Sequence, residues 1–150
     1  MSTLSRTIGI RARVDDVFEF VTDPKNWKSF VSGLLDVREI SPGGLQKGSV
    51  FVWEYSMMGM RLSGRGEVTG FEKNRKFGLS LAGKFPITER YEFIERPEGT
   101  ELAVEIDYEM PEDILGKTAG RNLVEQYNEI EATCSLDKLK LLCEALVMRK

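Results

Sequence analysis

Apolar and polar positions follow two regular periods along the chain. Between residues 47 and 110 they alternate, and turn signals recur about every ten residues, which is typical of an antiparallel meander. After Pro111 the apolar spacing becomes helical, and residues 122–148 contain neither proline nor glycine. This stretch therefore predicts one long C-terminal helix. The strands expected in the meander run over residues 49–58, 60–71, 76–81, 87–95 and 100–110.

The first 46 residues are less regular. Alternation over residues 4–13 and 35–40 predicts two further strands, with the segment VDDVFEFVTDPKNWKSF between them. The first half of this segment has apolar residues at helical spacing. The pair Asp23-Pro24 then favours the start of a second short helix, with the aspartate as its N-cap. The predicted order is strand, two short helices, six strands and one long helix.

One face of the predicted sheet is apolar. In the last strand, Leu102, Val104 and Ile106 alternate with polar or small residues, so one side is covered and the other meets water. A one-sided sheet and a long amphipathic helix bury each other, and a twisted sheet curls around the helix. We therefore predict an α+β fold in a single domain, residues 1–150. A curved antiparallel sheet of about seven strands wraps around the C-terminal helix and leaves room for a cavity.

Composition and charge narrow the classes of partner. The sequence is 41% apolar and 30% charged, as in ordinary soluble proteins, and its formal net charge is −3. A negative chain has no general attraction to nucleic acid or acidic membranes, so we expect no nucleic-acid partner. The sequence has no apolar run long enough for an integral membrane segment and no secretory signal, which predicts a cytoplasmic protein.

The absence of histidine limits the chemistry of the chain. It excludes Ser-His-Asp and Cys-His sites made within the chain, and the two cysteines make a zinc site improbable. We expect neither a metal nor a cofactor. The alternation also places every strand carboxylate on the solvent-exposed face of the sheet. This placement argues against acid–base catalysis. These carboxylates are Glu54, Glu67, Glu89, Glu92, Glu105 and Asp107.

Three motifs, in the predicted order of elements, resemble a known superfamily. They are ARVDDVFEFVTDPKNW in the first helical unit, Gly99-Thr100 before the last strand, and SLDKLKLLCE at residues 135–144. Together they are similar to the START/SRPBCC proteins, the birch-pollen-allergen-like helix-grip superfamily, and specifically to its polyketide cyclase/dehydrase and lipid-transport branch. The likeness covers nearly the whole chain. It implies a helix-grip fold with a ligand cavity between the sheet and the C-terminal helix.

The covered face supplies the candidate ligand-binding residues. Its aromatic side chains form either a solid core or the wall of a pocket, and the resemblance favours a pocket. The ligand-binding hypothesis requires a cavity above roughly 300 Å³. We expect Trp27 and Phe30 near its mouth. Gly64 and Gly66 mark either curvature of the sheet or a widening of the cavity. The candidates are Trp27, Phe30, Phe51, Trp53, Tyr55, Met57, Leu62, Leu79, Leu81, Tyr91, Phe93, Val104, Ile106, Tyr108, Leu123, Tyr127 and Ile130.

Three functions remain open from the sequence. The favoured one is binding of a small hydrophobic or amphipathic molecule, such as a lipid, polyketide, quinone or sterol-like compound. The second is an enzyme of the aromatase/cyclase or dehydratase type that uses bound water and tyrosines to transfer protons. The tyrosines are Tyr55, Tyr91, Tyr108 or Tyr127, and none of them is singled out as catalytic. The third is an accessory protein that binds a protein partner. Pairing of an exposed edge strand in a homodimer also remains open.

Overall fold

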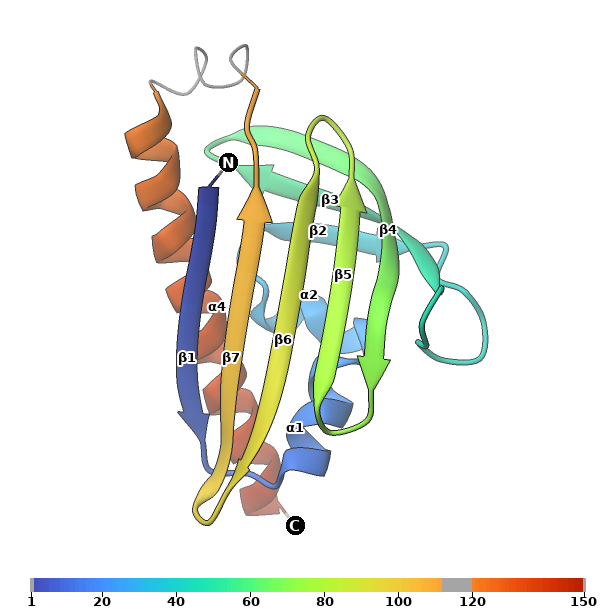
Figure 1. The fold of residues 1–150 in the computed structure, drawn as a ribbon, viewed down its shortest axis with the longest axis vertical. Helices are drawn as coiled ribbons and strands as arrows, with labels where there is room; N and C mark the ends of the chain where they lie inside the picture. The colour runs from blue at the N-terminus through green and yellow to red at the C-terminus, as the bar shows by residue number, and fades with distance from the viewer. Residues whose placement is uncertain (1, 112–119, 150) are drawn as a thin grey trace.

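A seven-stranded antiparallel sheet and a long C-terminal helix make up most of the structure. The computed structural model describes residues 2–111 and 120–149 (Figure 1). The strands are β1 (Ser2–Ile10), β2 (Leu34–Arg38), β3 (Val50–Met57), β4 (Met60–Glu72), β5 (Lys76–Ala82), β6 (Ile87–Arg96) and β7 (Gly99–Tyr108). The helices are α1 (Val14–Val21), the 3-10 helix η1 (Pro24–Asn26), α2 (Trp27–Phe30) and α4 (Arg121–Arg149). The predicted α+β class and the predicted order of elements are confirmed.

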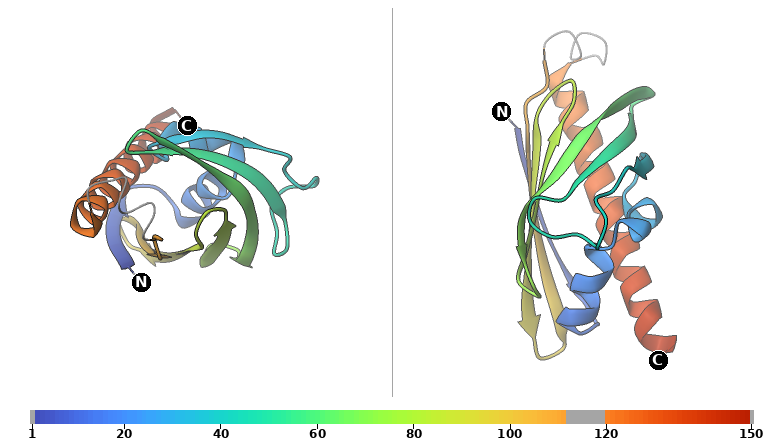
Figure 2. Two further views of the ribbon diagram at one scale, coloured as in Figure 1. Left: turned by 90° about the horizontal axis from the view of Figure 1, so that it is seen from above. Right: turned by 90° about the vertical axis from the view of Figure 1, so that its right-hand side faces the viewer.

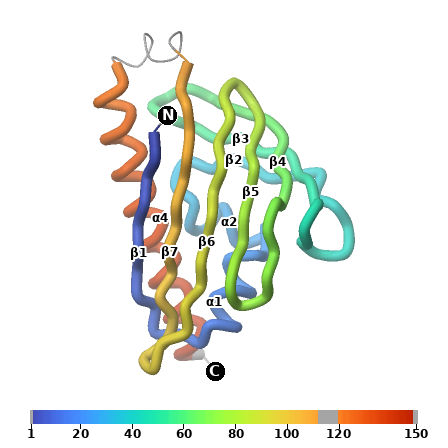
Figure 3. The backbone as a smooth tube through the Cα atoms, in the orientation of Figure 1, coloured from blue at the N-terminus to red at the C-terminus, as the bar shows by residue number. Residues whose placement is uncertain are grey.

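The sheet has the order β1-β7-β6-β5-β4-β3-β2. Every neighbouring pair of strands is antiparallel. The first strand in the sequence, β1, pairs over its whole length with the last one, β7. Figure 3 shows this pairing as the blue and orange tubes that lie side by side. Consecutive strands in the meander are therefore neighbours, as the short turns between them require.

The sheet is strongly curled. The long strand β4 pairs with β3 through its first half and with β5 through its second half, so it belongs to both arms of the sheet. Seen from above in Figure 2, the arm that holds β2 and β3 faces the arm that holds β6 and β7, and α4 runs along the open side. This curvature creates the space in which the candidate site lies.

The short helices close one end of that space. α1 contacts β6, β7 and α4, and α2 contacts β2 and α4. Phe18 of α1 packs edge-to-face on Phe71 and Phe93, with ring centroids 5.3 and 5.0 Å apart. The first half of the aromatic segment is therefore core packing. The predicted cap of the second helix is also present, because the Asp23 side chain accepts a hydrogen bond of 3.0 Å from the Lys25 backbone N–H.

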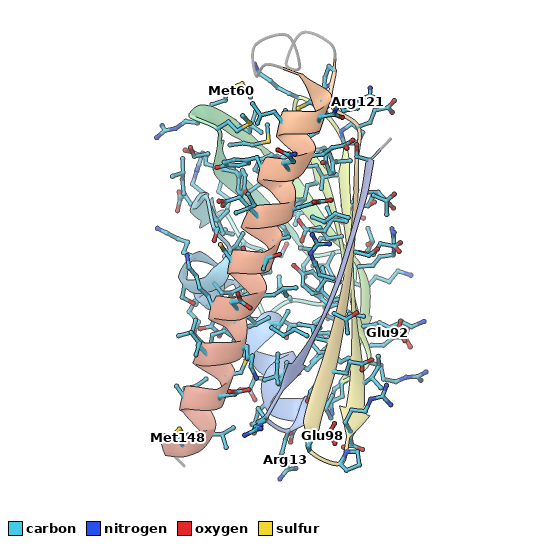
Figure 4. The ribbon with its side chains drawn as sticks, turned by 90° about the vertical axis from the view of Figure 1, so that its left-hand side faces the viewer. Arg13, Met60, Glu92, Glu98, Arg121 and Met148 are labelled. Carbon is cyan, nitrogen blue, oxygen red and sulfur yellow. The ribbon has the colours of Figure 1, made fainter. Side chains whose placement is uncertain are left out.

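The first half of helix α4 turns a different side toward the sheet from the one that the sequence predicts. Val124 is buried, whereas Leu123 is 44% exposed and Ile130 is 62% exposed. Further along, Leu139 and Cys143 are buried as predicted. Figure 4 views α4 from its outer side, between Arg121 and Met148. The expected inward stripe is wrong for the first half because the face that turns toward the sheet there is largely polar.

The glycines of β4 leave room for close contacts and not for a ligand. A Cβ on Gly64 would overlap the carbonyl oxygen of Ala82, and one on Gly66 would overlap the ring of Phe51. The irregular register of β4 falls later, between Val68 and Gly70. Gly64 and Gly66 do not line the cavity, and they lie where β4 passes from one arm of the sheet to the other. They allow a neighbouring backbone and an aromatic ring to approach β4 closely.

Candidate functional site

A cavity of about 210 Å³ lies between the two arms of the sheet, helix α2 and helix α4. It is partly open, and most of its wall is apolar. Most of the predicted residues meet there, contributed by α2 and by the five strands from β3 to β7. They are Trp27, Phe30, Phe51, Trp53, Tyr55, Met57, Leu62, Leu79, Leu81, Tyr91, Val104, Ile106 and Tyr108.

Four predicted residues do not line this cavity. Phe93 lies in the aromatic core beside Phe18 at the closed end. Leu123 and Ile130 are on the exposed side of α4, and Tyr127 is half-buried against the core. The three candidates expected from α4 therefore do not line the cavity, although Leu136 of the same helix does.

The cavity is smaller than the expected minimum of roughly 300 Å³. Three aromatic side chains occupy part of the space: Phe51 covers Gly66, Trp27 packs edge-to-face on Phe51 at 5.1 Å, and Phe85 turns inward from the turn between β5 and β6. Trp27, Phe30 and Phe85 are all buried, so Trp27 and Phe30 belong to the wall and not to an exposed mouth. Phe85 was not among the candidate residues, although it lies in the GKFP loop that the resemblance places near the access to the cavity.

A carboxylate lines the cavity, which corrects the assignment of all strand carboxylates to the wet face. Glu89 lies on β6 between Ile87 and Tyr91, and all three line the cavity. The Tyr91 hydroxyl donates a hydrogen bond of 2.9 Å to Glu89 Oε1. The signal was present in the sequence, because residue 89 has the same parity along the strand as Tyr91 and Phe93. The assignment of Glu89 to the outer face was therefore a misreading of the alternation.

Burial controls the protonation of this pair. Loss of solvation raises the pKa of Glu89, and the hydrogen bond from Tyr91 opposes part of that rise. Burial also raises the pKa of Tyr91 well above its ordinary value, and the charge of Glu89 adds to the effect. The tyrosine therefore stays protonated, and the carboxyl holds its proton more tightly than a carboxyl in water.

Glu89→Gln is expected to stabilise the protein at pH 7 by on the order of 1 kcal/mol and to have little effect at pH 4. The folded state binds the Glu89 proton more tightly than the unfolded state. The wild type therefore loses stability as pH rises from the unfolded pKa through the raised folded pKa, whereas glutamine does not titrate. Urea unfolding of both proteins at the two pH values measures the difference.

Glu92→Gln is the matched control, because Glu92 lies on the same strand with its side chain exposed. It should show no comparable gain in stability between pH 4 and pH 7. The sequence contains no histidine, the side chain that ordinarily titrates between pH 5 and 8. An equal gain for both variants, or none for Glu89→Gln, would contradict the assignment of Glu89 to the cavity.

Helix α4 contributes three polar side chains, one small one and the apolar Leu136 to the wall. Asn128, Glu131, Ala132 and Ser135 line the cavity at spacings of three or four residues, which places them on one side of the helix. Ser135 Oγ also accepts a hydrogen bond of 2.9 Å from the Ser32 backbone N–H, which ties α4 to the end of α2. An apolar stripe could not have indicated the polar residues of this wall.

The two tryptophans in the wall differ in their hydrogen bonding. Trp27 Nε1 donates to the Val21 carbonyl oxygen at 2.7 Å. Trp53 Nε1 is buried and has no hydrogen-bond partner among the described residues. A buried N–H without a partner is costly, so Trp53 presents an unused donor in a residue that lines the cavity.

Arg6 is the basic residue among those that line the cavity, and its side chain is already engaged. Its guanidinium donates to the Ser5 carbonyl oxygen at 2.8 Å and lies 3.9 Å from a carboxylate oxygen of Glu129. Its Nε also contacts Thr133 Oγ1 at 3.4 Å. The group is held between β1 and α4 at the outside of the cavity.

Metal sites and membrane spans are both missing from the part of the chain that the structure describes. No three or more acidic or cysteine side chains gather within residues 2–111 and 120–149 in a way that could hold a metal ion. No described helix combines the length and the apolar character that crossing a membrane requires.

A curled sheet, closed by a C-terminal helix around a cavity, defines the helix-grip class of α+β proteins. The sequence profile of the family described as polyketide cyclase / dehydrase and lipid transport matches residues 1–144. The chain therefore belongs to this family, as the motifs had indicated. A search of curated proteins finds none that matches the sequence.

Solved structures show the same fold at low sequence identity. The protein TTHA0849 from Thermus thermophilus is 17% identical with a TM-score of 0.81, over 97% of this chain and 99% of that one. The Zhui aromatase/cyclase from Streptomyces sp. R1128 is 17% identical with a TM-score of 0.79, over 97% and 95% of the chains. Ara h 8.0201 is 11% identical with a TM-score of 0.67, over 96% and 98%.

Proposed function

We propose that this protein binds a compact hydrophobic or amphipathic molecule in the cavity between its sheet and α4. The observation that carries the proposal is a largely apolar cavity into which few polar side chains reach. This combination is typical of small-molecule sites, where apolar surface supplies affinity and polar groups fix orientation. Membership of the polyketide cyclase / dehydrase and lipid transport family supports the same function.

The volume of the cavity limits the size of the ligand. A dry apolar cavity of roughly 150 Å³ is enough to bind benzene. A cavity of about 210 Å³ with an open side therefore suits a molecule of one or two rings, or a larger one that extends into solvent. A whole sterol or a long acyl chain would need the aromatic side chains of the wall to move.

Native mass spectrometry of the purified protein, followed by organic extraction, tests the binding function. We expect an additional mass that extraction removes, and saturation by one naphthalene per chain in equilibrium dialysis. Naphthalene is chosen because it matches the cavity in size and carries no polar group. A protein that is free of bound mass and does not bind naphthalene would overturn the proposal.

Acid–base catalysis is a second candidate, and the Glu89–Tyr91 pair is the observation that favours it. A partly buried carboxyl with a raised pKa, beside a protonated tyrosine, is suited to move a proton to or from a bound carbonyl compound. Exchange of the α-protons of 2-tetralone with deuterium, followed by NMR, tests this function. An enzyme should accelerate the exchange and lose the effect in Glu89→Gln, whereas a simple binding protein should do neither.

A further inference from the structure

The charged groups of the cavity wall are not balanced. Besides its tyrosines, the ionisable residues that line the cavity are Arg6, Glu89 and Glu131. Arg6 is turned toward Ser5 and Glu129. The wall therefore offers carboxyl groups to a ligand, but no cation that lacks a partner. A ligand carboxylate would enter beside groups of its own sign and away from water, which is unfavourable.

The same wall offers hydrogen bonds to an uncharged ligand. Among the described residues, Glu89 has Tyr91 as its hydrogen-bond partner. The Tyr91 hydroxyl occupies only one of the two carboxyl oxygens of Glu89. The second oxygen accepts from a ligand hydroxyl when Glu89 is ionised and donates to a ligand oxygen when it is protonated. On the facing arm of the sheet, the Trp53 N–H is a donor without a partner among the described residues.

We infer that the cavity selects uncharged ring compounds that carry a hydroxyl or carbonyl oxygen, and rejects carboxylates of the same size. The inference rests on the proposed binding function and specifies the class of ligand. An oxygen on the ligand satisfies Trp53 or Glu89, whose hydrogen-bonding capacity the described residues leave partly unused. A purely apolar ligand fills the cavity but leaves these hydrogen-bonding groups without a partner. An anionic ligand lies beside the carboxyl groups of Glu89 and Glu131.

Equilibrium dialysis at pH 7 with three probes of one shape tests the inference. The probes are naphthalene, 2-naphthol and 2-naphthoate, which differ only in carrying no group, an uncharged hydroxyl or a carboxylate. We expect 2-naphthol to bind at least ten-fold more tightly than 2-naphthoate and several-fold more tightly than naphthalene. Equal or tighter binding of 2-naphthoate would overturn the inference and leave the binding function standing. Failure of all three probes to bind would overturn the binding function itself.

Variants identify the groups responsible. Glu89→Gln keeps the shape of the side chain and removes its charge, so 2-naphthoate should gain at least five-fold in affinity while 2-naphthol changes by less than about three-fold. Trp53→Phe removes the N–H. It should lower the affinity for 2-naphthol several-fold relative to the affinity for naphthalene. Glu92→Gln removes a charge from the outer face of the same strand, where Figure 4 places Glu92, and should change none of the affinities. An equal gain of 2-naphthoate affinity in both glutamine variants would contradict a local role for Glu89.

Discussion

Ala132→Trp is expected to reduce naphthalene binding at least a hundred-fold while the protein stays folded. Ala132 lines the cavity from α4, opposite the curled sheet, and is one of the small side chains in the wall. An indole at this position occupies most of a volume of about 210 Å³, and the partly open side of the cavity gives the new ring room to adjust. Equilibrium dialysis measures the loss of binding, and thermal unfolding confirms that the fold is retained.

Ala145→Trp provides the matched control. Ala145 lies on the same helix with its side chain exposed, so the same change in size and helix propensity is made away from the cavity. It should leave naphthalene binding within two-fold of the wild type. Loss of binding in both variants would indicate that α4 tolerates no tryptophan, and unchanged binding in Ala132→Trp would place the ligand elsewhere.

Gly64→Ala is expected to lower the free energy of unfolding by about 2–4 kcal/mol. The added methyl group would overlap the carbonyl oxygen of Ala82 and lie 3.0 Å from the Gly83 Cα, both of which are backbone atoms. A side chain can rotate away from such a contact, but here the end of β5 and the turn that brings Phe85 into the cavity must shift. Urea denaturation measures the change.

Gly9→Ala is the comparison for this effect. Gly9 is also a strand glycine, and a Cβ there meets no atom within 4 Å. Alanine at position 9 should be neutral or slightly stabilising, because glycine has the larger conformational entropy in the unfolded chain. Similar losses at both positions would mean that the close approach to Ala82 is not what constrains Gly64.

The course of the sheet was predictable from the sequence, because a period of two fixes which side chains share a face. Phe51 and Trp53 on β3 and Leu102 and Val104 on β7 are all buried on the side where alternation placed them. Strand ends were less accurate. The first strand ends at Ile10 and not at residue 13, since the chain must turn there before α1 begins at Val14.

The face of α4 was not predictable in the same way. An apolar stripe indicates the buried side of a helix only when that side packs against a solid core. The first half of α4 borders a cavity, so Asn128 and Ser135 face inward while Ile130 is exposed. The volume of the cavity was equally out of reach, because it depends on how the rings of Trp27, Phe51 and Phe85 turn.

The wrong prediction for Glu89 has a different origin. Its position along β6 already placed it with Tyr91 and Phe93, so the alternation contained the correct answer. The prediction misread this alternation at Glu89, and the misreading agreed with the general rule that carboxylates avoid buried faces. An exception to that rule on a clean strand is informative, because buried groups with shifted pKa values gather at functional sites.

The unequal hydrogen bonding of the two tryptophans gives the protein its own spectroscopic reporters. The sequence has two tryptophans, and both border the cavity. In a proton–nitrogen correlation spectrum their indole N–H groups give two signals outside the crowded amide region. The Trp27 signal is held by the Val21 carbonyl, whereas the Trp53 signal should move when a ligand oxygen accepts from it. One spectrum per compound would then tell whether a molecule has bound and whether it presents an oxygen to Trp53.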